Sequence, residues 1–178
     1  TGIGYSCTKI LCNSGYFVYG SVRKSEDAER IKNKLGDNFH PLIFDVTDSK
    51  AILENIEKVK NDLKPGESIA GLVNNAGIAL GGPVTLIDTE VFRKQFDVNF
   101  FGLIDVTKAY LPLLGASKES SNQGKIINIS SISGKRSHPF MAPYTASKFA
   151  LEAFSDSLRR ELLIYGVDVI LIEPGPIK

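Results

Sequence analysis

The sequence contains few of the residues from which metal centres and cross-linked folds are built. Its 178 residues include two cysteines, Cys7 and Cys12, and two histidines, His40 and His138. Two cysteines exclude a disulfide framework and a four-cysteine zinc site, and neither histidine has a second metal ligand at helical spacing. We therefore predict no metal centre, and we expect both thiols to be packing residues of a protein in a reducing compartment.

The chain also has little net charge and no long apolar run. Lysine and arginine number 21 against 20 aspartate and glutamate residues, which gives a formal net charge of +1. A general binder of nucleic acids needs a strongly basic face, so this balance argues against a nucleic-acid partner. The most apolar stretch, residues 100–116, is interrupted by Asp105, Lys108 and Pro112, whereas a transmembrane helix needs about 18 apolar residues in a row. We predict no transmembrane segment in this chain and a cytoplasmic location.

Two common catalytic signatures are missing as well. The sequence has neither the G-x-S-x-G motif of hydrolases nor a phosphate loop that ends in Gly-Lys-Ser or Gly-Lys-Thr. The remaining composition is that of a globular protein, with 43% hydrophobic and 23% charged residues. At about 150 residues per domain, the length corresponds to a single domain with a sizeable core.

Predicted helices and strands alternate along the chain. Helices are predicted at residues 3–13, 25–35, 49–63, 89–114 and 144–165, and strands at 16–22, 42–44, 69–73, 125–129 and 167–172. The strands are short and show no strict alternation, which is typical of strands buried on both faces. Repeated strand–helix–strand units predict an α/β fold, a doubly wound parallel sheet of the Rossmann type in a single domain. Such a sheet binds ligands at the carboxyl ends of its strands.

A pair of glycines at the start of a predicted helix is the first candidate site. Gly2, Ile3 and Gly4 lead directly into the helix predicted at 3–13. Glycine lets the backbone approach a pyrophosphate closely, and a helix N-terminus offers free N–H groups and a favourable dipole. The same residues also suit a simple turn, so both interpretations are open.

The next two strand ends carry a base and an acid. Arg23 follows the first predicted strand, where a site for an adenosine ribose often has an acid, and its guanidinium suits a 2′-phosphate. An exposed surface arginine is the alternative. Asp45 and Val46 follow the second strand, where a small acid can bind an adenine amino group, and a helix N-cap shared with Asp48 is the alternative.

Tyr144 and Lys148 are four residues apart on a predicted helix. This spacing places both on one face, about 40° apart. An ammonium beside a phenol favours the phenolate and lowers its pKa from about 10, so the phenol can exchange a proton with an alcohol. A purely structural pair is the alternative. Further along the helix, Glu152 and Asp156 are predicted to balance the two arginines that follow them.

Two more strand ends carry small and polar residues. Residues 74–77 are Asn-Asn-Ala-Gly, which form a tight turn that leaves room for a flat ligand. Ser131 follows the strand predicted at 125–129, where its hydroxyl can bind a substrate oxygen.

Together these motifs resemble the short-chain dehydrogenase/reductase family over nearly the whole chain. The matching positions are Thr1-Gly2-Ile3-Gly4 at the end of the T-G-x-x-x-G-x-G motif, Asn74-Asn75-Ala76-Gly77 for N-N-A-G, the helix asparagine Asn99, the serine Ser131, Tyr144-Thr145-Ala146-Ser147-Lys148 for Y-x-A-S-K, and Pro174-Gly175 for P-G. Their order and spacing make the resemblance specific. The helix segment at residues 151–162 is similar to members that act on retinoids, steroids and other apolar alcohols.

The resemblance implies a role for each matching residue. In the catalytic set, Tyr144 is the general acid/base, Lys148 lowers its pKa and binds the nicotinamide ribose, Ser131 positions the substrate oxygen, and Asn99 binds a proton-relay water. In the cofactor set, Gly2, Ile3 and Gly4 face the pyrophosphate, Arg23 selects NADP, Asp45 and Val46 flank the adenine, Asn75, Ala76 and Gly77 lie at the adenosine and ribose, and Pro174, Gly175 and Ile177 edge the nicotinamide.

The resemblance also implies a cofactor, a substrate and partners. We expect NADP, with NAD as the alternative, and a small-molecule alcohol or ketone that is apolar. We expect a homodimer or homotetramer, because related enzymes form subunit interfaces with the long helices that begin here at Thr89 and Tyr144. The family's first strand and its C-terminal part are absent, so residues 1–178 are expected to be a dinucleotide-binding oxidoreductase domain that is incomplete at both ends.

Two other functions are compatible with the same motifs. One is a dinucleotide-binding sensor or scaffold without catalysis. The other is an epimerase or dehydratase of the related extended type, which uses the same Tyr–Lys pair.

Overall fold

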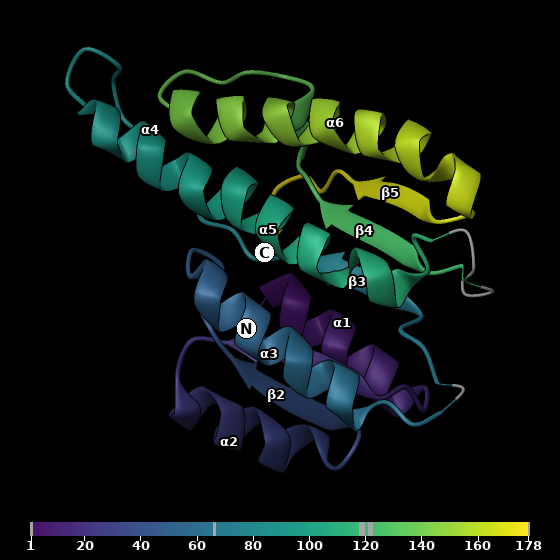
Figure 1. Cartoon of the computed structure of the whole chain (residues 1–178). Coiled ribbons are helices and arrows are strands. Elements are labelled where there is room, and N and C mark those ends of the chain that lie inside the picture. The colour runs from purple at the N-terminus through teal and green to yellow at the C-terminus, as the bar shows by residue number, and fades with distance from the viewer. Residues whose placement is uncertain (1, 66, 118–119, 121–122, 178) are drawn as a thin grey trace. The chain divides into compact units, whose positions relative to one another are not determined.

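Parallel strands and helices alternate in both parts of the chain (Figure 1). The computed structural model describes residues 2–65, 67–117, 120 and 123–177. The chain divides into two compact units, Thr1–Lys64 and Pro65–Lys178, and each is described by itself. The arrangement is the Rossmann-like α/β fold that the sequence predicts. Within the described ranges, no helix is long and apolar enough to cross a membrane.

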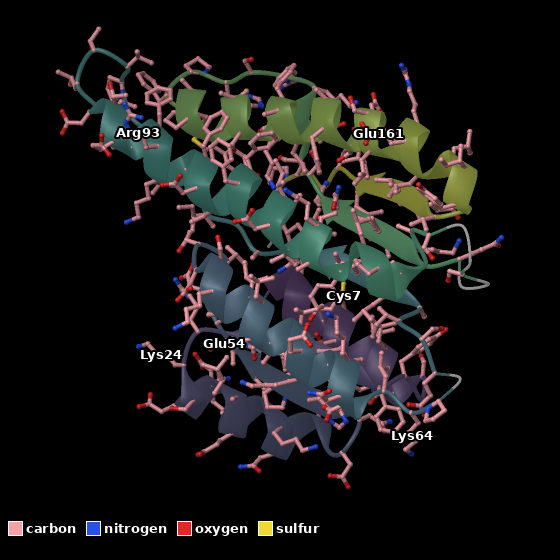
Figure 2. The ribbon with its side chains drawn as sticks, in the orientation of Figure 1. Cys7, Lys24, Glu54, Lys64, Arg93 and Glu161 are labelled. Carbon is pink, nitrogen blue, oxygen red and sulfur yellow. The ribbon has the colours of Figure 1, made fainter. Side chains whose placement is uncertain are left out.

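The first unit is a two-stranded parallel sheet with three helices. Its elements are α1 (Gly2–Asn13), β1 (Val18–Val22), α2 (Ser25–Leu35), β2 (Phe39–Ile43) and α3 (Ser49–Asp62). Cys12, Ile31 and Phe39 are buried together, so Cys12 is a packing residue as predicted. A side chain at Gly20 would meet the Phe39 ring, which lies 2.4 Å from the Cβ position there. Lys24 and Lys64 are exposed and point outward from this unit (Figure 2).

The strand predicted at 42–44 begins earlier than expected. It includes Phe39, which is 2% exposed, and it pairs with β1 from Phe39 onward. The prediction was wrong because His40 and Pro41 are not typical strand residues. A proline is tolerated here because β2 pairs with a strand on one side within this unit.

The second unit is a three-stranded parallel sheet in the order β3-β4-β5. Its elements are β3 (Gly71–Asn74), α4 (Thr89–Phe96), η1 (Asp97–Phe101), α5 (Gly102–Tyr110), η2 (Leu111–Leu114), β4 (Lys125–Ile129), η3 (Ile132–Gly134), α6 (Ala142–Leu162), η4 (Leu163–Tyr165) and β5 (Asp168–Ile172). Helix α5 packs against β3 and α6 against β5, while α4 contacts α6. Because the strands are parallel neighbours, their carboxyl ends lie at one edge of the sheet.

The helix predicted at 89–114 spans those residues but is not regular. A π-helical turn, η1, interrupts it at Asp97–Phe101, and a 3₁₀ turn, η2, ends it at Leu111–Leu114. A π-turn accommodates one extra residue, which a helical pattern of apolar residues does not reveal. Pro112 lies in the 3₁₀ turn, near the place where the sequence predicts a bend.

Amide and hydroxyl side chains link the second unit's sheet to its helices. Asn74 Nδ2 donates to Asn128 Oδ1 at 2.9 Å and to Thr107 Oγ1 at 2.9 Å. Asn128 Nδ2 donates to Ser155 Oγ at 2.9 Å. All four residues are buried. Because each polar group has a partner, the network compensates for desolvation and specifies how β3 and β4 pack on α5 and α6.

Removing the centre of this network should destabilise the protein. We expect Asn128→Ala to lower the free energy of unfolding by about 2–3 kcal/mol, because Asn74 and Ser155 each lose a buried partner. Urea unfolding of the full-length protein measures the loss. Asn61→Ala, at an exposed position of α3, is the control and should change stability by less than about 0.5 kcal/mol. Equal effects of the two substitutions would contradict the prediction.

Candidate active site

Tyr144 and Lys148 lie together in the first turns of α6. The Lys148 Nζ atom is 5.8 Å from the centroid of the Tyr144 ring. Pro143 lies in the first turn, where its missing N–H group needs no partner within the helix. The structure thus brings together the two side chains that the four-residue spacing predicts to be neighbours.

Lys148 is buried at the carboxyl end of β4. The residue is 7% exposed. Its Nζ donates to the carbonyl oxygen of Ile129, the last residue of β4, at 2.8 Å. Burial lowers the pKa of Lys148 to about 8, while the negative charge of Glu152 acts in the opposite direction. At neutral pH Lys148 is therefore still protonated in most molecules, and a positive charge lies beside the phenol.

Ser131 follows the same strand end by two residues. It caps the short turn η3, and its Oγ accepts a hydrogen bond from the Ser133 N–H at 3.1 Å. The neighbouring backbone is bound to the end of β5, because Ser130 N–H donates to Ile172 O at 2.8 Å and Ile132 N–H to Pro174 O at 3.1 Å. The Ser131 hydroxyl can still donate its own proton to a substrate oxygen.

Asn99 lies in the π-turn and is bonded to protein groups. It is 1% exposed; Oδ1 accepts from Ile78 N–H at 2.9 Å, and Nδ2 donates to Ile78 O at 3.0 Å and to Ser147 Oγ at 3.2 Å. Ser147 Oγ donates in turn to Tyr144 O at 2.7 Å. The side-chain amide therefore connects η1 to the turn of α6 that carries Tyr144. A relay water at Asn99 stays a prediction.

The predicted cofactor residues of the second unit follow the other two strand ends. Residues 75–77 come directly after β3, and Ala76 and Gly77 are exposed. Residues 174–177 come after β5, and apart from the two chain neighbours no atom of a described residue lies within 4 Å of the Cβ position at Gly175. These segments share one sheet edge with Ser131, as the fold class predicts.

The first unit contains the remaining predicted cofactor residues. Gly2 begins α1 with φ of +67°, a conformation that favours glycine, and among the described residues beyond its neighbours in the helix no atom lies within 4 Å of its Cβ position. Ile3 and Gly4 follow in the first turn, whereas Thr1 lies outside the described residues. Arg23 comes directly after β1 and is exposed.

Asp45 forms a turn of its own and shares no helix cap. Its Oδ1 accepts from Thr47 N–H at 3.0 Å and from Thr47 Oγ at 2.8 Å. These bonds, and the charge of Arg23, lower the pKa of Asp45. Asp48 caps α3 by accepting from an N–H of the first turn at 2.9 Å. The interpretation of Asp45 as part of a shared N-cap is therefore wrong, and its place beside an adenine, with the half-buried Val46, stays a prediction.

Glu152 has partners that the sequence interpretation missed. The residue is 6% exposed; it accepts a hydrogen bond from Ser130 Oγ and forms an ion pair with Lys135, with Nζ 2.8 Å from Oε2. Its carboxylate raises the pKa of Lys135. The prediction that Glu152 balances an arginine of its own helix is wrong, whereas Asp156 does pair with Arg159.

The helical spacing did indicate that Glu152 is buried beside Lys148. Glu152 follows Lys148 by four residues, so it lies on the same buried face of α6. Gly134 leaves room for the carboxylate, because a Cβ there would lie 2.8 Å from Glu152 Cγ. Lys135 Nζ also lies 3.6 Å from Oε1 of Glu173, the residue directly after β5. The distant partners depended on how the loop after β4 folds, which spacing along one helix does not show.

Replacing Lys148 by methionine should stabilise the protein at neutral pH. The pKa of Lys148 falls from 10.5 to about 8 on folding, so the folded protein bears a cost of about 3 kcal/mol for the protonated amine at pH 7. Methionine avoids that cost and loses one hydrogen bond, so we expect Lys148→Met to raise the free energy of unfolding by about 2 kcal/mol. The gain should shrink as pH rises through the window from about 8 to 10.5, because wild-type lysine becomes neutral first in the folded and then in the unfolded state.

Urea unfolding of both proteins across that pH range measures the difference. Lys125→Met serves as the control, because the Lys125 side chain is 53% exposed and its replacement should change stability only slightly at neutral pH. A Lys148→Met protein that is less stable than wild type by the same amount at every pH would contradict the expectation.

Comparison with known proteins gives matches over the full length of the chain. Residues 1–178 match a family model described as short chain dehydrogenase. The chain is 49% identical to an NADPH-dependent 3-dehydrocapnine reductase of Ornithobacterium rhinotracheale and 38% identical to retinol dehydrogenase 16 of Mus musculus. These alignments include 100% and 98% of this chain but 62% and 53% of the relatives, so the chain spans less than two thirds of their length. The closed form of serine dehydrogenase complexed with NADP+ is 34% identical, with a TM-score of 0.82 over 94% of this chain and 65% of that structure.

Proposed function

Because the chain belongs to the short-chain dehydrogenase family, we propose that it is part of an oxidoreductase that transfers a hydride between a nicotinamide dinucleotide and an alcohol or ketone. The membership confirms the family that the motifs predict. The observation that carries the proposal is the buried amine of Lys148 beside the Tyr144 ring, at the carboxyl end of β4. A structural helical pair has no need of a desolvated charge at this position.

Tyr144 is the group that exchanges a proton with the substrate oxygen. In ketone reduction its hydroxyl donates the proton to the carbonyl oxygen, and in alcohol oxidation its phenolate accepts the hydroxyl proton. The Lys148 amine lies 5.8 Å from the centroid of the Tyr144 ring, and water is largely excluded around this lysine. Ser131 donates a hydrogen bond to the same substrate oxygen. The bound nicotinamide supplies or accepts the hydride.

Each unit has residues that suit a part of a dinucleotide. In the first unit, the open Cβ position at Gly2 and the free N–H groups of the first turn of α1 suit a pyrophosphate, with Ile3 and Gly4 beside it. In the second unit, the exposed glycines at 77 and 175 leave the backbone accessible to a flat ring. Residues 75–77 bind the adenosine and ribose, and residues 174–177 edge the nicotinamide. Asp45 and Val46 flank the adenine.

NADP is the preferred cofactor in this proposal. Arg23 is exposed directly after β1, and its guanidinium can form two hydrogen bonds to a 2′-phosphate. A relative is named as NADPH-dependent, and a similar solved structure is complexed with NADP+. Both names support the preference for NADP over NAD.

The substrate is an apolar alcohol or ketone. Pro139, Phe140 and Met141 come just before α6, and Phe140 is 64% exposed, so its ring is available to an apolar ligand. One relative is named a retinol dehydrogenase, which supports this class of substrate. A homodimer or homotetramer is proposed because Phe101 and Phe149 are 54% and 43% exposed on η1 and α6. A cytoplasmic location stays a prediction.

Tyr144→Phe should abolish turnover and leave cofactor binding intact. Loss of the general acid should lower kcat at least about 100-fold, while the Kd for NADPH stays within about twofold, because the ring is retained. Nicotinamide absorbance, with both reduced cofactors and ketones from small polar to steroid-sized, measures turnover in the full-length protein. Tyr165→Phe, in the turn η4 that follows α6, is the control and should keep full activity. Cofactor binding with no turnover of any ketone or alcohol by wild type would contradict the proposal and favour a sensor.

Arg23→Met should weaken binding of NADPH selectively. One charged pair to the 2′-phosphate is lost, so we expect the Kd for NADPH to rise at least about tenfold and the Kd for NADH to change little. Arg30→Met is the control, since Arg30 on α2 pairs with Asp27. Calorimetric titration with both cofactors measures the ratio, and a wild-type protein that binds NADH more tightly than NADPH would overturn the assignment.

A further inference from the structure

Gln95 is a fully buried polar residue for which the sequence suggested no role. It lies in α4 and is 0% exposed, two residues after Arg93, which is exposed and labelled in Figure 2. Its Nε2 donates to Ile78 O at 2.8 Å, and its Oε1 accepts from Leu80 N–H at 2.7 Å. Both ends of the amide are therefore used, and both bind the loop that follows β3.

Gln95 and Asn99 both bind the loop after β3, from successive turns of the helical stretch formed by α4 and η1. The two residues are four apart and both amides bind the segment 78–80, which has no strand or helix of its own. Ile78 O accepts from both side chains, and Ile78 N–H donates to Asn99. The two amides supply the hydrogen bonds that a neighbouring strand would supply to an extended segment. The position of the loop therefore depends on them.

The same loop contacts the turn that leads into α6. Gly82 N–H donates to Phe140 O at 2.7 Å. A Cβ at Gly81 would lie 2.4 Å from Phe140 O, so the close approach requires glycine there. Phe140 has φ of 65°, the only positive value at a non-glycine residue among the described residues. This left-handed conformation costs energy for a bulky side chain and persists where neighbouring contacts impose it.

The strained turn connects directly to the proton-transfer residue. Met141 N–H donates to His138 O at 3.2 Å, and Thr145 N–H donates to Met141 O at 2.8 Å. Tyr144 therefore lies in the first turn of a helix whose start is fixed by the backbone at 138–141. A change at Phe140 would shift the phenol with that turn.

We propose that Gln95 is a positioning residue for Tyr144, acting through the loop 78–82 and the left-handed turn at Phe140. The inference rests on the proposed function, in which Tyr144 exchanges the proton. Gln95 touches neither substrate nor cofactor in this role. It binds the loop, the loop binds the carbonyl of Phe140, and the turn sets the direction in which α6 presents the phenol.

Thr107 provides a matched control for a merely structural effect. Like Gln95, Thr107 is 0% exposed and its side chain forms a buried hydrogen bond. Its partner, however, is Asn74 in β3 and not the loop 78–82. Thr107→Val and Gln95→Met each exchange a buried polar side chain for an apolar one of similar size. They differ in whether the loop 78–82 loses its contacts.

The experiment compares these two variants in the full-length protein. Hydrogen exchange by mass spectrometry is followed in peptides that contain residues 78–82 and 138–145, and kcat is measured per bound cofactor. In Gln95→Met we expect exchange in both segments to rise at least about tenfold and kcat to fall about 10- to 100-fold, with the Kd for NADPH within about twofold. In Thr107→Val we expect neither segment nor kcat to change by more than about twofold. If Gln95→Met does not fold, Gln95→Asn, whose amide is one methylene too short, replaces it.

The outcomes separate this inference from the proposed function. If the Gln95 variant matches Thr107→Val in exchange and in kcat, the inference is overturned. If exchange rises at 78–82 but not at 138–145, the link from the loop to Tyr144 is overturned. If wild type shows no turnover, the proposed function fails, and the exchange data still decide whether Gln95 orders the turn before Tyr144.

Discussion

Burial of a positive charge at the carboxyl end of β4 imposes most of the polar arrangement around it. The Lys148 amine is desolvated, donates to the last carbonyl of the strand and has the carboxylate of Glu152 one helical turn away. Glu152 is itself buried and needs its own partners, which are Ser130 and Lys135. Gly134 leaves the space for that carboxylate. Lys148 and Glu152, with these partners, thus connect α6 to the end of β4 and to the residues around η3.

Buried side-chain amides form the hydrogen bonds that fix several strands and one loop in place. Asn74 and Asn128 connect the strands to the helices, and Gln95 and Asn99 bind a loop that has no ladder of its own. Each amide offers a donor and an acceptor, so a misplaced neighbour leaves a desolvated group without a partner. This penalty makes the arrangement specific as well as stable. The loop, the turn at Phe140 and the first turn of α6 are consequently defined by hydrogen bonds from side chains.

Several features could not be anticipated because they depend on contacts distant in the sequence. The periodicity of residues 89–114 predicts a helix correctly, but a π-turn adds one residue without disturbing the apolar pattern enough to be seen. The early start of β2 follows from the burial of Phe39 under Gly20, which pairing with β1 creates. The partners of Glu152 lie on a loop more than a dozen residues away, and helical spacing is silent about them.

The sequence alone determined the α/β class, the family and the neighbourhood of Tyr144 and Lys148. Strand–helix alternation and the four-residue spacing are local properties, and local geometry translates them directly into structure. Tertiary structure decided the rest: which carbonyl the lysine binds, which carboxylate offsets it and why Phe140 adopts a left-handed backbone. Hydrogen bonds and desolvation act between groups that folding brings together, so their effects have no signature in the order of residues.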